Sequence, residues 1–208
     1  MRAEERREQL LDVTKEIVGE SGFHAVSIEA VARRAGISRP IVYGHFQDLS
    51  GLLEALVQRE GERALAQLEE VLPGERPSGD AREPLLAALR GYLEAVRADP
   101  VTWRLVLMPP EGAPELLRER IAVGRAAVVA QLAEIVGPGL GTEPESPDPE
   151  LTARTLSALA DESARLVLTN PRRYPVERVL EHARWLLGEL GPARPGVAGA
   201  PRASRRSG

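Results

Sequence analysis

The stretch IEAVARRAGISRPIVYGHF, residues 28–46, determines the fold at the N-terminal end of this chain. Its first half has one apolar face with helical spacing, formed by Ile28, Val31, Ala32 and Ala35. Ser27 precedes this face as a suitable N-cap, because its hydroxyl can accept from first-turn amides. Gly36 follows it, where a helix can end in the left-handed conformation that glycine adopts readily. The pattern predicts a short helix that ends in a tight turn.

The second half of the stretch predicts another short helix. Ser38 is expected to cap it, and Pro40 fits its first turn, where a missing N–H is tolerated. Val42 and Phe46 are spaced i, i+4 and are expected to face inward. The small Ala32 allows the two helices to cross closely. Two short helices joined by a glycine turn form a helix-turn-helix, a motif that places its second helix in a DNA groove.

The outer face of the second helix separates DNA binding from an ordinary helical hairpin inside a core. A buried hairpin would not normally expose Arg39, Tyr43 and His45 together. The guanidinium fork of Arg39 matches guanine O6 and N7, so Arg39 is the expected base reader. Pro40 and Ile41 can contact a thymine methyl group. Gly44 would allow the helix to approach DNA closely.

Residues 7–57 resemble the tetracycline-repressor-like (TetR) family of bacterial regulators. The matching residues are Gly22-Phe23, Ser27-Ile28-Glu29-Ala30-Val31-Ala32, Ala35-Gly36-Ile37-Ser38, Val42-Tyr43-Gly44-His45-Phe46 and Leu52-Leu53. The resemblance implies that Tyr43 and His45 meet DNA phosphates. It also implies that Ser27 and Ser38 do so, through hydroxyls or helix N-terminal amides. The family often has a lysine three residues after the phenylalanine, where this chain has Leu49, so one backbone contact is expected to be missing.

The composition of the 208 residues is that of a globular protein, with 43% hydrophobic and 28% charged residues. No apolar run is long enough to span a membrane, the N-terminus does not resemble a signal peptide, and cysteine is absent. These features predict a soluble cytoplasmic protein. The net charge is −4, and residues 1–47 hold seven basic and seven acidic side chains. Strong non-specific DNA binding is therefore not expected. Lys15 is the only lysine, and no role is assigned to it.

The rest of the chain predicts an all-α protein of about nine helices. Helices are expected over residues 3–20, 48–72, 80–98, 100–107, 113–136, 151–170 and 176–190, with loops at 73–79 and 137–149. The predicted units are a helix-turn-helix domain (1–47), a helical effector-binding and dimerisation domain (48–190) and a disordered basic tail (191–208).

The TetR resemblance also implies partners for the C-terminal part. Such regulators usually dimerise through their last two long helices, here about 151–170 and 176–190, and often bind a small, largely apolar effector. Candidate effector contacts are Tyr92, Trp103, Arg104, Met108 and Arg165, although core filling explains each of them as well.

The sequence favours a ligand-responsive repressor that binds a near-palindromic operator as a homodimer. Repression is favoured over activation because no segment looks like a polymerase-contacting surface. No catalytic motif, metal-ligand spacing or cofactor-binding loop is present. Two alternatives remain: a constitutive DNA-binding protein without an effector, and a helix-bundle enzyme with facing carboxylates in a pocket.

Overall fold

The computed structural model describes residues 2–72, 81–109, 115–137 and 148–190, and these residues form nine α-helices and one 3₁₀ turn. The helices are α1 (Ala3–Ser21), α2 (Ile28–Ala35), α3 (Arg39–Phe46), α4 (Leu49–Val71), α5 (Arg82–Ala98), α6 (Pro100–Leu107), α7 (Glu115–Val136), α8 (Pro149–Thr169) and α9 (Val176–Leu190), with the 3₁₀ turn at Phe23–Ala25. The all-α prediction is confirmed. The predicted tail, residues 191–208, and most of the two predicted loops lie outside the described residues.

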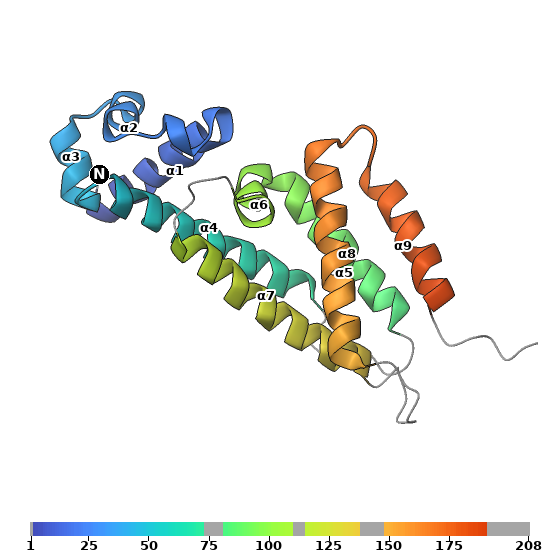
Figure 1. The fold of residues 1–208 in the computed structure, drawn as a ribbon. Coiled ribbons are helices and arrows are strands. Elements are labelled where there is room, and N and C mark those ends of the chain that lie inside the picture. Colours follow the sequence, from blue (N-terminus) through green and yellow to red (C-terminus); the bar gives the residue numbers. More distant parts are fainter. Residues whose placement is uncertain (1, 73–80, 110–114, 138–147, 191–208) are drawn as a thin grey trace, which may run out of the picture.

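The N-terminal helices α1, α2 and α3 form one end of the molecule, and α4 leads from them into the body (Figure 1). In the body, α7 lies along α4 and packs on α8, while α5 contacts both α8 and α9. The short helix α6 lies between the two parts and contacts α1, α4 and α8. The helix α4 and the helix α6 therefore connect the N-terminal end to the body.

The apolar face predicted for the helix-turn-helix forms a buried core. Val31 and Val42 are fully buried, and Phe46 is 4% exposed. These residues pack with Leu10 of α1 and with Leu52 of α4. The N-terminal core therefore includes residues from the first turns of α4.

The helix caps account for two differences from the sequence predictions. The helix α8 begins at Pro149 rather than at Leu151, because Asp148 Oδ1 accepts hydrogen bonds from Glu150 N and Leu151 N at 2.8 and 3.3 Å. Ser38 occupies the N-cap position of α3, but its side chain makes no capping hydrogen bond. Pro40 has no N–H to offer, and the amide of Ile41 donates to the Ser38 carbonyl instead.

Candidate functional site: a recognition helix, a cavity and the contact between them

The turn between α2 and α3 has the geometry that its sequence predicts. Ser27 Oγ accepts a hydrogen bond from Ala30 N at 3.0 Å and caps α2. Gly36 ends α2 in the left-handed region, with φ 67°, and the amide of Ile37 donates to the Ala32 carbonyl at 3.0 Å. The direction of α3 relative to α2 is thus fixed by backbone hydrogen bonds as well as by the core.

Most of the residues predicted to contact DNA are exposed. Arg39, Pro40, Ile41, Tyr43 and Gly44 are exposed, with Ile41 at 43% and Tyr43 at 48%. A Cβ atom added to Gly44 would meet no atom within 4 Å. The same exposure holds for Ser27 and Ser38, whereas His45 is half-buried. Two large apolar side chains exposed on one short helix are unusual unless a partner covers them.

The end of α3 is held by a residue that the sequence analysis did not single out. Arg7 of α1 places its guanidinium 4.6 Å from the centre of the Phe46 ring. Its Nη1 donates to the carbonyl oxygen of His45 at 3.3 Å. Arg7 therefore ties α1 to the C-terminal end of the recognition helix, where a helix favours a nearby cation.

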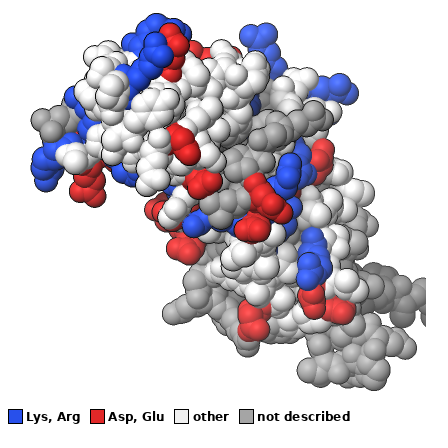
Figure 2. Space-filling model, turned by 60° about the vertical axis from the view of Figure 1, so that its left-hand side comes forward, with Lys and Arg blue, Asp and Glu red and all other residues white. Residues whose placement is uncertain are grey.

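The charges around this end are of both signs. Arg39 lies 3.8 Å from Glu29, and Arg34 pairs with Glu20 at 2.5 Å and with Glu16 at 3.3 Å. Figure 2 shows basic groups at the top of the molecule with acidic groups among them. The surface is therefore suited to specific contacts more than to general attraction of phosphates.

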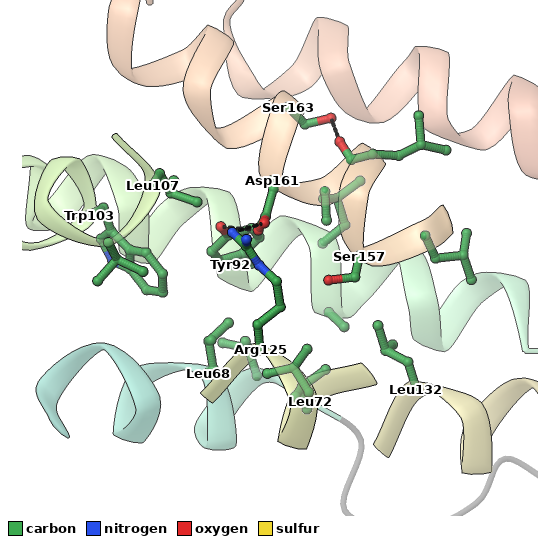
Figure 3. A pocket seen from close by; sticks show the side chains of 18 of the residues that line it. Leu68, Leu72, Tyr92, Trp103, Leu107, Arg125, Leu132, Ser157, Asp161 and Ser163 are labelled. Atoms are coloured by element: carbon green, nitrogen blue, oxygen red, sulfur yellow. Dashed lines mark hydrogen bonds and ion pairs between the residues drawn. The ribbon is translucent and has the colours of Figure 1, made fainter. Parts of the chain in front are cut away.

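The body of the molecule encloses a cavity of about 870 Å³, lined by residues of α4, α5, α6, α7, α8 and α9 together with Tyr174. Its walls are mostly apolar, and Leu68, Leu72, Leu107 and Leu132 are among them (Figure 3). A cavity of this size and character is typical of a small-molecule site.

The structure separates the five predicted effector contacts into two groups. Tyr92 and Trp103 line the cavity, with their ring centres 5.0 Å apart in an edge-to-face arrangement. Arg104, Met108 and Arg165 are not among the lining residues. Arg104 is exposed, and Arg165 Nε donates to the Leu107 carbonyl at 3.1 Å, so it caps the end of α6. Arg104 lies on α6 as Trp103 does, but opposite faces of this helix have different surroundings. Position on α6 therefore does not by itself identify a residue of the cavity wall.

A polar cluster on the cavity wall was missed by the sequence analysis. Asp161 Oδ2 accepts a hydrogen bond from Arg125 Nη2 at 2.6 Å, and its Oδ1 accepts one from the Tyr92 hydroxyl at 3.3 Å (Figure 3). Burial, with the nearby Asp161 charge, raises the pKa of Tyr92 well above its ordinary value. Tyr92 therefore remains a neutral hydrogen-bond donor. Because Arg125 and Asp161 lie on different helices, 36 residues apart, no local pattern links them.

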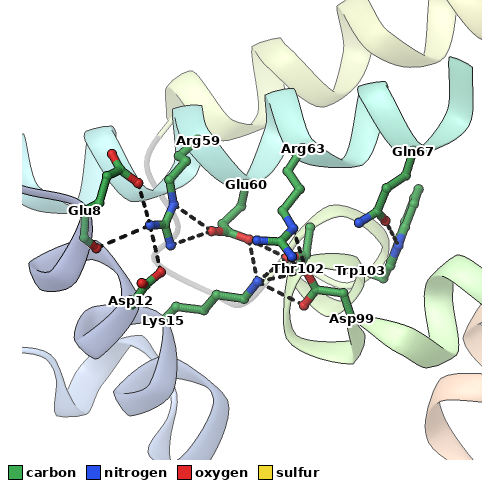
Figure 4. A network of polar contacts seen from close by, with 10 residues as sticks. All are labelled: Glu8, Asp12, Lys15, Arg59, Glu60, Arg63, Gln67, Asp99, Thr102 and Trp103. Atoms are coloured by element: carbon green, nitrogen blue, oxygen red, sulfur yellow. Dashed lines mark hydrogen bonds and ion pairs between the residues drawn. The ribbon is translucent and has the colours of Figure 1, made fainter. Parts of the chain in front are cut away.

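A second polar cluster joins the N-terminal end to the body (Figure 4). Lys15 of α1 donates from Nζ to Glu60 of α4 at 2.7 Å, to Asp99 at 2.9 Å and to the Thr102 hydroxyl of α6 at 2.6 Å. The Thr102 hydroxyl in turn donates to Glu60, which is 1% exposed. The single lysine of the chain therefore bridges three helices.

Two arginines of α4 complete this second cluster. Arg59 pairs with Glu60 at 2.8 Å and with Asp12 of α1 at 2.9 Å, and Arg63 pairs with Asp99 at 3.0 Å. Burial raises the pKa of Glu60, but the hydrogen bonds from Lys15 and Thr102 outweigh this effect, so its pKa lies below the ordinary value. The carboxylate of Glu60 is therefore ionised at neutral pH.

The second polar cluster lies next to the cavity along both connecting helices, α4 and α6. Trp103, next to Thr102, lines the cavity and donates from Nε1 to Gln67 Oε1 at 2.9 Å. Gly61, next to Glu60, lines the cavity as well. A change in the cavity wall at either position is thus directly connected to the contact between α1 and the body.

The residues that the structure describes hold no arrangement of three His, Asp or Glu side chains suited to a metal ion. Over the same ranges, none of the helices has both the length and the apolar character that crossing a bilayer requires.

The fold and the exposed recognition helix define a helix-turn-helix transcriptional regulator. Residues 10–56 match the family model of the bacterial regulatory proteins of the tetR family. The N-terminal end of the chain therefore matches this TetR family. The proteins of this family, and the relatives that match over more of the chain, are transcriptional regulators rather than enzymes.

Similarity to known proteins extends beyond the N-terminal end. The chain is 27% identical to the HTH-type transcriptional activator FasR of Mycolicibacterium smegmatis, over 84% of this chain and 77% of FasR. A TetR-like transcriptional regulator from Rhodococcus sp. RHA1 superposes with a TM-score of 0.69 and 25% identity, over 90% of this chain and 97% of that one. A transcriptional regulator from Saccharomonospora viridis, solved in complex with choline, has the same fold, with a TM-score of 0.67 and 21% identity over 90% and 97% of the two chains.

Proposed function

We propose that this protein is a ligand-responsive repressor that acts in the cytoplasm and binds a near-palindromic operator as a homodimer. The observation that carries the proposal is the combination, in one chain, of an exposed recognition helix with a large apolar cavity. A constitutive DNA-binding protein has no use for such a cavity. The choline complex of the Saccharomonospora viridis regulator supports a ligand site in a body of this fold.

The dimer is proposed to form through α8 and α9. Leu151 and Leu159 of α8 and Trp185 of α9 are large apolar side chains with exposed fractions of 62%, 41% and 60%. Exposed apolar groups on two neighbouring helices favour burial against a second copy of the same surface. The dimer would present two α3 helices to successive major grooves, about 34–36 Å apart.

In this proposal Arg39 reads a base, Pro40 and Ile41 contact a thymine methyl group, and Gly44 allows close approach. The hydroxyl of Tyr43 and the ring of His45 contact phosphates, as do Ser27 and Ser38. The exposure of this surface supports these roles. The functional division is into a DNA-binding unit, residues 1–47, and an effector and dimerisation unit, residues 48–190.

Effector binding is proposed to change DNA affinity through α4 and α6. A ligand that displaces Trp103 would move Thr102, and Thr102 contacts Lys15 of α1. The ligand can shift DNA affinity only by its differential affinity for the two arrangements. A dimer bound over a promoter would exclude polymerase without a further contact surface, which favours repression. In a promoter-reporter assay, expression of the protein should lower reporter output; a rise, as expected for an activator such as FasR, would contradict repression.

The experiment that tests DNA recognition is selection of bound duplexes from a random library, followed by binding titrations. The selected sequence should be a near-palindrome. Arg39→Ala should weaken binding by about 1–3 kcal/mol and relax preference at one position per half-site. Arg90→Ala, an exposed arginine on α5, is the control and should leave binding unchanged. Equal loss on all sequences would make Arg39 a phosphate contact, and failure to select any preferred sequence would contradict the proposal.

A further inference from the structure

The cavity wall contains a serine whose hydroxyl is unused. Ser157 of α8 is 7% exposed, lines the cavity, and points toward its centre (Figure 3). Its neighbour Ser163 donates back to the Leu159 carbonyl at 2.7 Å, as helical serines commonly do. No hydrogen bond from the Ser157 hydroxyl to the described part of the chain takes it up in this way. Because this hydroxyl opens onto the cavity rather than being sealed inside the protein, it is available to a group that enters the cavity from outside the chain.

Asp161 lies one helical turn from Ser157 and has hydrogen-bonding capacity to spare. Residues at i and i+4 lie about 5–6 Å apart on one helix face. A carboxylate offers about four acceptor positions, and Asp161 uses two of them, for Tyr92 and Arg125. One polar group placed between the two side chains could donate to Asp161 and accept from Ser157. A hydroxyl or an amide has both capacities.

The charges along the cavity are balanced. Its charged lining residues are three acids and three arginines: Glu62, Glu119, Asp161, Arg120, Arg125 and Arg178. On the cavity wall, the exposed Arg125 and the half-buried Asp161 already pair at 2.6 Å. An anion that paired with Arg125 would lie close to the Asp161 carboxylate and be repelled by it. A cation that paired with Asp161 would likewise be repelled by the Arg125 guanidinium. Since an ion entering an apolar cavity must recover its lost hydration, neither is favoured.

We propose that the effector is an uncharged molecule with an apolar body and one hydroxyl or amide group, which binds between Ser157 and Asp161. This inference rests on the proposed function, because it names the chemical class of the effector. The apolar body lies against the leucines of α4 and α7, such as Leu68 and Leu132. Ser157 and Asp161 select the polar group, and Arg125 keeps the site neutral.

The test uses three probes with the same ten-carbon chain: decan-1-ol, decanoate and decyltrimethylammonium. Each is titrated into the full-length protein by calorimetry without DNA, at neutral pH and below its micelle-forming concentration. Decan-1-ol should bind at least about tenfold more tightly than either ion. Tighter binding of either ion, or no binding of decan-1-ol, overturns the inference.

Variants sharpen the test. Ser157→Ala should weaken decan-1-ol binding about three- to tenfold, the range expected for one hydrogen bond. The matched control Ser163→Ala should leave binding unchanged, because Ser163 lines the same cavity but is already bonded within its helix. Arg125→Gln should shift preference toward the cation, and Asp161→Asn toward decanoate. Unchanged preference in both charge variants contradicts the proposed site.

Failure of this inference can be distinguished from failure of the proposed function. Binding titrations need no operator, whereas the proposed function is tested by release of the selected operator. Selective binding of decan-1-ol without any change in operator affinity would support the site and count against ligand-responsive regulation. Operator release by an ionic ligand in preference to a neutral one would support regulation and overturn the neutral effector class.

Discussion

Replacement of Lys15 by methionine tests whether the contact between α1 and the body depends on its charge. Methionine keeps most of the apolar stem and removes the ammonium group that contacts Glu60, Asp99 and Thr102. In the variant, Glu60 remains 1% exposed and Asp99 13% exposed, with only arginines of α4 to balance them. The variant should therefore leave the buried carboxylate of Glu60 and the half-buried carboxylate of Asp99 with incomplete compensation.

The expected destabilisation can be bounded from these contacts. Removal of one partner from a buried ion pair costs about 3–5 kcal/mol. Arg59 still contacts Glu60 at 2.8 Å, and Arg63 still contacts Asp99 at 3.0 Å, so we expect about 2–3 kcal/mol. For a chain of this size that corresponds to a fall in melting temperature of about 4–12 °C. Urea unfolding followed by circular dichroism, at one fixed protein concentration, measures the loss in free energy of unfolding.

The pH dependence provides a second measurement with a defined sign. In the native protein the pKa of Glu60 is lowered, so its stabilising contribution is present above its ordinary pKa of 4.5 and is lost as pH falls through the folded value. In Lys15→Met, burial without the ammonium group should raise this pKa, and protonation should then relieve the unpaired charge. The difference in unfolding free energy between the two proteins should therefore be smaller at about pH 5 than at about pH 7.5.

The control is Arg90→Met, which removes one partner of an exposed pair on α5, separated by 3.8 Å. Exposed pairs contribute about 0–1 kcal/mol, so this variant should be close to the parent. If Lys15→Met costs no more than Arg90→Met, or if its cost does not shrink at lower pH, the reasoning about the buried cluster is wrong.

Three further variants test the recognition helix, the first turn of α4 and the dimer. Gly44→Ala should raise the free energy of unfolding by up to about 1 kcal/mol and yet weaken operator binding; unchanged binding would place DNA elsewhere. Gly51→Ala should destabilise the fold by more than about 2 kcal/mol in urea unfolding, because its Cβ would collide with the backbone oxygen of Phe46. Gly61→Ala, in open space on the same helix, should not, and equal effects would refute the steric argument. Trp185→Asp should reduce dimerisation in sedimentation equilibrium, and an intact dimer would exclude this surface.

The helix-turn-helix could be predicted because its determinants are local. The caps, the turn glycine and the apolar spacing all lie within residues 27–46, so each constraint is visible in the sequence. Even there, the lack of a side-chain cap at Ser38 depends on competition with its own backbone carbonyl for a single amide. Patterns of residue type do not show whether the Ser38 hydroxyl or the Ser38 carbonyl accepts the hydrogen bond from this amide.

The polar contacts of the cavity wall and the Lys15 cluster could not be predicted, because their members are distant in sequence. Lys15 meets Asp99 across 84 residues, and Arg125 meets Asp161 across 36. A charged residue on a helix usually faces solvent, and only the packing of α1, α4 and α6 shows that Lys15 does not. Composition does not show it either, since being the only lysine among 27 basic residues assigns Lys15 no role.

The uniqueness of Lys15 makes its amine a chemical reporter. Reagents that acylate primary amines can react with only one side chain in this protein, and that side chain is 15% exposed with three partners at its nitrogen. Acylation therefore requires α1 to separate from α4 and α6. The modification rate, followed by mass spectrometry of the peptide that contains Lys15 so that the N-terminal amine is not counted, would measure how often the two parts undock.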